Sequence, residues 1–133
     1  MTYKSSFAFN LIYVIRVNDE SHQGCLKIGK TTVDCETSAA AWPPPNSKLL
    51  NQAAKDRINR YMQTGGFAYD LLHTELAVRA KNGKTEAFMD ADVHKVLERT
   101  GIKKKIFDVE AQANEWYVAD LETVKKAIAA VKD

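Results

Sequence analysis

The sequence predicts a single α/β domain whose elements follow one another in the order ββαβαβα. The chain of 133 residues is 45% hydrophobic and 27% charged, a composition typical of one globular domain. Runs of β-branched and aromatic residues alternate along it with segments whose apolar residues recur at helical spacing. No internal repeat or low-complexity tract is visible, so we treat residues 1–133 as one domain.

The N-terminal third predicts a β-hairpin followed by a loop. Residues 11–17 (LIYVIRV) are typical of a strand, and a second short apolar run covers residues 25–28 (CLKI). The segment 18–24 between them is rich in turn-forming residues, which favours a hairpin. From residue 31 to residue 47 the periodicity is lost and three prolines follow Trp42, which predicts a loop.

The rest of the chain predicts three helices and two strands. Apolar residues recur at helical spacing in segments 48–63, 85–100 and 121–131, and glycines follow the first two of these segments. β-forming residues predict a strand over 67–79, which the KNGK turn closes, and a short last strand over 115–118.

Charge and cysteine content narrow the function classes. The 19 basic and 17 acidic residues leave a formal charge of +2, so a nucleic-acid surface would have to be local. Cys25 and Cys35 lie ten positions apart without metal-ligand or CxxC spacing, which indicates reduced structural thiols. Because no apolar stretch reaches the length of a membrane span and no hydrophobic signal region is present, we expect a cytoplasmic protein without a membrane partner.

Four short motifs occur in order between about residue 11 and residue 128. In chain order they are Ile12-Tyr13, Lys27-Ile28-Gly29-Lys30-Thr31 with Arg57 in the following helix, Asp90 with His94 four positions later, and Asn114-Glu115-Trp116-Tyr117. This series resembles the GIY-YIG nuclease superfamily. The resemblance is to its phage and bacterial branch, with a second motif KIGKT and a C-terminal motif of EW plus an aromatic residue.

The resemblance implies a GIY-YIG-like fold, with a small central three-stranded antiparallel sheet flanked by helices, in agreement with the predicted order. It also implies metal-dependent hydrolysis of phosphodiester bonds in DNA. In such enzymes Mg²⁺ or Mn²⁺ is held by one carboxylate and waters and stabilises charge on the scissile phosphate. A basic side chain supports the phosphate, and a tyrosine network orients the attacking water.

Matching positions give the metal-site residues their expected roles. Asp90 aligns with the metal-binding carboxylate, which is usually a glutamate in the family. Glu86, four residues earlier on the predicted helix, could supply or share the ligand. His94 would contact phosphate or water, or else be a packed or capping histidine.

The phosphate and water residues come from the other motifs. Arg57 matches the helix arginine that stabilises the transition state, and Tyr61 lies one turn later on the same helix face. Tyr13 matches the tyrosine of the first motif, and with Tyr61 it would orient the water. Lys30 is a phosphate candidate, and Gly29 would allow close approach of a phosphate or a helix unless turn geometry explains it.

Lys27 replaces the tyrosine of the second motif. An ammonium with a pKa of about 10.4 is a poor base near neutral pH unless burial lowers that pKa. Lys27 could instead bind phosphate, or it is a solvated strand residue. The substitutions at Lys27 and Asp90 favour an alternative, a catalytically inactive module of the same fold that binds nucleic acid or a protein.

The sequence says less about the binding partners of the protein than about the reaction it would catalyse. Lys103, Lys104 and Lys105 are candidate accessory contacts to phosphate, although a solvated charge run is the commoner explanation. One domain leaves no room for a separate DNA-reading module, so specificity would be modest or come from a homodimer or a partner protein. RNA is an alternative substrate, and a phage or mobile-element role is compatible with the resemblance.

Overall fold

The computed structural model describes residues 6–36, 42–62, 69–82, 84–104 and 116–132. Over these residues the chain has the mixed α and β content that the sequence predicts. The elements are β1 (Ser6–Val17), β2 (Cys25–Glu36), α1 (Lys48–Met62), β3 (Tyr69–Leu76), β4 (Val78–Lys81), β5 (Lys84–Ala87), α2 (Asp90–Arg99), β6 (Trp116–Val118) and α3 (Leu121–Lys132).

The main sheet is antiparallel and has four strands in the order β3-β1-β2-β6. The resemblance implies three strands, and the fourth arises because β6 pairs with the first three residues of β2. The predicted hairpin is confirmed as β1 and β2, but the loop expected from residue 31 is wrong up to Glu36. Val33 and Cys35 are buried at alternate positions there and pair with Phe9 and Phe7 of β1.

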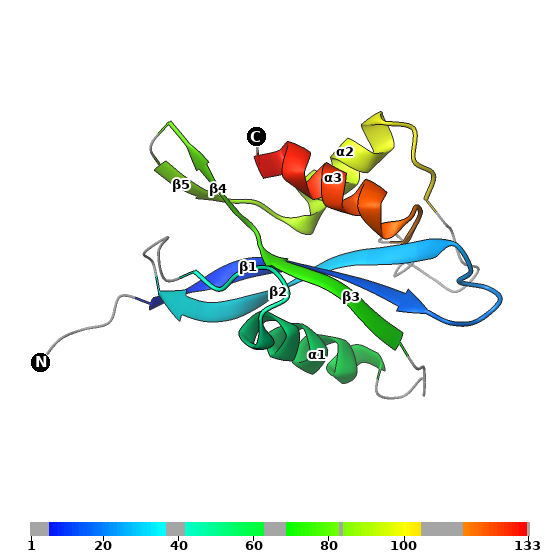
Figure 1. Cartoon of the computed structure of the whole chain (residues 1–133), viewed down its shortest axis with the longest axis horizontal. Helices are drawn as coiled ribbons and strands as arrows, with labels where there is room; N and C mark the ends of the chain where they lie inside the picture. The colour runs from blue at the N-terminus through cyan, green and yellow to red at the C-terminus, as the bar shows by residue number, and fades with distance from the viewer. Residues whose placement is uncertain (1–5, 37–41, 63–68, 83, 105–115, 133) are drawn as a thin grey trace, which may run out of the picture.

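Helices cover both faces of this sheet, with α1 on one side and α2 and α3 on the other (Figure 1). Because alternate strand residues point to opposite faces, β1 contributes to two separate cores. The α1-side core contains Leu11, Tyr13, Ile15, Val33, Leu50, Ala54, Ile58 and Leu76. The core on the α2–α3 side contains Ile12, Val14, Ile28, Val93, Leu97, Tyr117, Val124 and Ile128.

Strands β4 and β5 form a separate two-stranded ribbon. The predicted helix 85–100 is therefore wrong over its first residues, since α2 begins only at Asp90. The ribbon turns at Asn82, whose φ of 54° lies in the left-handed region that asparagine tolerates. The predicted strand 67–79 divides into β3 and β4 at Ala77, whose N–H donates to Asn10 O over 2.8 Å.

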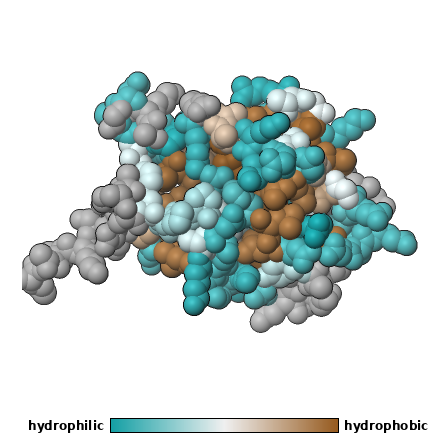
Figure 2. Space-filling model, in the orientation of Figure 1, coloured by the Kyte–Doolittle hydropathy of each residue, from teal (hydrophilic) through white to brown (hydrophobic). Residues whose placement is uncertain are grey.

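The other predicted helices are confirmed as α1 and α3, and the predicted last strand is β6. Figure 2 shows hydrophilic residues over much of one face, with hydrophobic residues visible in the middle. Within the described part of the chain, no helix is both long enough and apolar enough to cross a bilayer.

Candidate functional site

Tyr13 and Gly29 form the centre of the candidate site. They are directly opposite each other in the β1–β2 pair, and Tyr13 is only 2% exposed beneath α1. A Cβ atom on residue 29 would lie 2.5 Å from both Cζ and Oη of Tyr13. The phenol ring therefore occupies the space over Gly29. Turn geometry does not explain this glycine, because Gly29 lies inside strand β2, and the approach of a phosphate or helix stays a prediction.

Lys27 lies on the same face of the sheet as Tyr13. It precedes Gly29 by two residues on β2 and pairs with Ile15, which belongs to the α1-side core. On its other side Lys27 pairs with Trp116 of β6, and its side chain is half-buried. Lys27 is therefore a basic group close to Tyr13 and partly open to solvent.

Arg57 is an exposed residue of α1, a helix that packs against both β2 and β3. One flank of α1 is over β3, because the Tyr69 hydroxyl donates to Asn59 Oδ1 over 2.9 Å. An α-helix turns by about 100° per residue, so Arg57 lies about 200° around the helix from Asn59. Arg57 therefore lies on the flank of α1 that faces away from β3, and we infer that this flank is the one nearer to β2, the strand that carries Lys27. The side chain of Tyr61 lies outside the described residues.

Asp90, His94 and Lys30 lie on the opposite face of the sheet. Asp90 is the first residue of α2 and is 8% exposed, and its Oδ1 accepts a 3.0 Å hydrogen bond from the Ala91 N–H. Lys30 pairs with Ile12, which belongs to the α2–α3 core, so both point to that face. The sequence motifs are therefore divided between the two faces.

His94 joins α2 to the sheet. Its Nε2 donates to Ile28 O over 2.8 Å, and its ring centroid lies 5.1 Å from that of Tyr117. These contacts give His94 a packing role, one of the two alternatives that the sequence left open. Both contacts are on the α2–α3 side, away from Tyr13.

The described residues do not fit a metal ion shared between Asp90 and a phosphate at Arg57, because the sheet separates the two side chains. Within the described ranges, no three histidine, cysteine, aspartate or glutamate side chains gather as a metal site. Glu86 is not on a helix, contrary to the prediction. It is exposed on β5, where its Oε2 forms an ion pair with Arg79 Nε over 3.2 Å.

Two lysines of the run, Lys103 and Lys104, lie next to β6. Lys103 O accepts a 2.8 Å hydrogen bond from the Val118 N–H, and Lys104 forms a bridge with Tyr117. Lys104 Nζ also forms a 3.0 Å ion pair with Glu98. Lys105, Asn114 and Glu115 lie outside the described residues. Lys103 and Lys104 are exposed, so the accessory phosphate contact remains a prediction.

A polar cluster at β3 was not predicted from the sequence. Glu75 accepts hydrogen bonds from His73 Nε2, over 2.9 Å, and from Lys132 Nζ. Asn46 Nδ2 donates to His73 Nδ1 over 3.3 Å. The Asn46 N–H donates to Thr74 O over 2.8 Å, and Asn46 Oδ1 accepts from the Thr74 N–H over 2.9 Å. The sequence does place His73 and Glu75 on one strand face. It gives no sign of Lys132, which is 57 residues away.

Folding stability should depend on pH through Glu75. Burial alone would raise the pKa of this carboxyl, but the hydrogen bonds from His73 and Lys132 outweigh it and hold the pKa below its ordinary value. A depressed folded-state pKa gives stability that is complete above the unfolded pKa, about 4.3, and is lost as the pH falls through the folded value. Urea unfolding at a series of acidic pH values should show this loss, and Glu75→Gln should reduce it.

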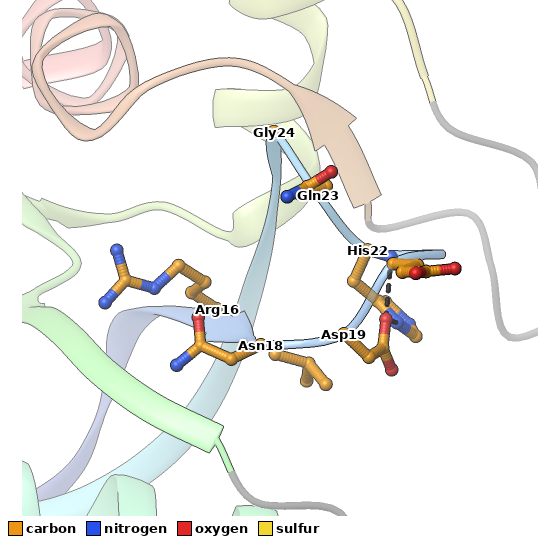
Figure 3. A pocket seen from close by; sticks show the side chains of 8 residues that line it. Arg16, Asn18, Asp19, His22, Gln23 and Gly24 are labelled. Atoms are coloured by element: carbon orange, nitrogen blue, oxygen red, sulfur yellow. Dashed lines mark hydrogen bonds and ion pairs between the residues drawn. The ribbon is translucent and has the colours of Figure 1, made fainter.

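A pocket lies at the tip of the β1–β2 hairpin (Figure 3). This pocket of about 360 Å³ is lined by Arg16, Val17, Asn18, Asp19, Glu20, His22, Gln23 and Gly24. Arg16 forms a 2.9 Å ion pair with Asp70, and His22 Nδ1 lies 2.6 Å from Asp19 Oδ1. The described residues of the four motifs do not line it.

Comparison of the chain with protein-family models, with curated proteins and with solved structures finds no match in any of the three. The fold places the chain in the mixed α and β class.

Proposed function

We propose that this chain is a GIY-YIG-type endonuclease that hydrolyses phosphodiester bonds in DNA at the Tyr13–Lys27–Arg57 face. The observation that supports this is the packing of Tyr13 on Gly29, with Lys27 beside them on the sheet face that α1 covers. Residues of the first two motifs are thus in contact. We infer that the flank of α1 that carries Arg57 is the one nearer to the strand of Lys27.

Each residue has a role that follows from its chemistry. Lys27 supplies a compact positive charge, and the Arg57 guanidinium can hold two phosphate oxygens at once. Fixed positive groups stabilise the negative charge that develops when water attacks phosphorus and the bond to the leaving oxygen breaks. Tyr13 packs over Gly29, and its phenol hydroxyl is a hydrogen-bonding group that would position the water or phosphate.

Plasmid cleavage tests the proposal. Purified protein is incubated with supercoiled plasmid in Mg²⁺, in Mn²⁺ and in EDTA, because the resemblance implies a divalent cation. We expect nicking or linearisation, and Arg57→Ala should lower its rate by at least about 100-fold. Lys55→Ala is the matched control, since this exposed lysine is also on α1 but away from the flank of Arg57.

A non-catalytic nucleic-acid-binding module is the second candidate. It is favoured by the position of Asp90, which lies across the sheet from the Arg57 flank. An enzyme that uses Asp90 should lose turnover but keep DNA binding in Asp90→Ala. If the wild-type protein binds DNA in a salt-sensitive way but cuts neither DNA nor RNA under any metal condition, the binding module is supported and the nuclease is not.

A further inference from the structure

The β4–β5 ribbon lies outside the main sheet and extends away from the body of the molecule (Figure 1). All four residues of β5 are exposed. Neither the fold nor the proposed catalytic face uses this element, so its shape and charge need a separate explanation.

The base of the ribbon is firmly attached. Val78 is buried in the α1-side core, and Phe88, just after β5, is buried in the other core. Arg79 Nη1 donates to Val131 O at the end of α3 over 2.8 Å, and Arg79 Nε pairs with Glu86 across the ribbon. These contacts fix the ribbon relative to both helical layers.

The charge pattern along the ribbon changes towards its tip. Near the base Arg79 is opposite Glu86, an attractive pair, whereas at the last pair before the turn Lys81 is opposite Lys84. Like charges directly opposite each other destabilise a strand pair. Three basic residues and one acidic residue give the ribbon a charge of +2, with the lysine pair next to the turn. A bound anion would offset the repulsion between these lysines.

We propose that the β4–β5 ribbon enters a groove of double-stranded DNA and that Lys81 and Lys84 contact phosphates there. This inference rests on the proposed function. Neighbouring strands are about 4.8 Å apart, so a ribbon fits the major groove, which is about 12 Å wide. Between the Arg79–Glu86 pair and the Lys81–Lys84 pair lies one pair of small residues, Ala80 opposite Thr85. The ribbon gives the domain a second DNA contact, separate from the Tyr13–Lys27–Arg57 face.

Salt-dependent DNA binding tests the ribbon separately from cleavage. Fluorescence anisotropy with a labelled duplex, between about 50 and 200 mM salt, compares wild type with the double variant Lys81→Ala/Lys84→Ala. We expect about tenfold weaker binding and a salt slope smaller by about 2, because each lysine neutralises one phosphate. The matched control is Lys95→Ala/Lys126→Ala, which removes the same charge from exposed sites on α2 and α3 and should bind like wild type.

Lys84→Glu gives a test with two readouts that should move in opposite directions. It turns the repulsive Lys81–Lys84 pair into an attractive one, so the Tm should stay the same or rise while duplex binding weakens. A fall in Tm would contradict the like-charge repulsion expected for the Lys81–Lys84 pair and would overturn the proposal.

Three further results would overturn the proposal. The ribbon variant could bind as tightly as the control while Arg57→Ala binds weakly, which would leave the proposed function standing without a role for the ribbon. The ribbon variant could lose as much affinity for single-stranded DNA as for duplex, which would contradict entry into a groove. If wild type bound no DNA at all, the proposed function would fail together with the ribbon proposal.

Discussion

Replacing Glu75 with alanine should lower the free energy of unfolding by roughly 3 kcal/mol, since removing one partner of a buried ion pair leaves the other groups uncompensated. His73 and Glu75 are buried, at 5% and 9% exposed, and Lys132 comes from the end of α3. The substitution thus removes the acceptor that joins β3 to α3. Urea unfolding should show a midpoint lower by more than about 1 M.

Glu75→Gln is the matched control for this result. The amide has nearly the same shape and can still accept one hydrogen bond, but it has no charge. We expect it to be more stable than Glu75→Ala and less stable than wild type at neutral pH. If Glu75→Ala were as stable as wild type, the cluster would contribute nothing to the folded state.

Gly29→Ala should destabilise the protein by roughly 2 kcal/mol and impair any activity of the Tyr13 face, because the new methyl group overlaps the phenol ring. The added Cβ would lie 2.5 Å from two atoms of Tyr13, and the ring is covered by α1. One of the two residues must move. Thermal unfolding and plasmid cleavage would measure the two effects.

A double-mutant cycle isolates the packing of Tyr13 on Gly29. In a Tyr13→Leu background no ring lies over position 29, so Gly29→Ala should cost much less there than in wild type. Equal costs in both backgrounds would show that the glycine is needed for a reason other than the Tyr13 ring.

The sequence predicts best where local pattern decides the structure. Leu50, Ala54 and Ile58 recur at helical spacing and are all buried in α1. The extension of β2 to Glu36 was not predicted because only Val33 and Cys35 are apolar there, and the strand exists by pairing with β1. Phe88 and Met89 fit helical spacing, which predicts a helix over segment 85–89, whereas Phe88 is buried as the chain leaves the ribbon.

For the candidate site, the sequence identifies the residues but not the face of the sheet on which each of them lies. Strand alternation is enough to place Lys27 and Gly29 on one face and Lys30 on the other. Whether α2 packs on the face of Tyr13 or on the opposite one depends on long-range packing, which no local pattern contains. The separation of Asp90 from the Arg57 flank is therefore visible only in the fold.

Asn46 has a consequence for how the molecule behaves at high concentration. An edge strand such as β3 offers unpaired backbone groups on which another chain can add a strand and begin aggregation. Asn46, held at a φ of 63°, uses its N–H and its side-chain oxygen to occupy both backbone groups of Thr74. Asn46 thus makes the two backbone hydrogen bonds that a neighbouring strand would make to Thr74. A second molecule cannot pair with β3 at this position without first displacing it.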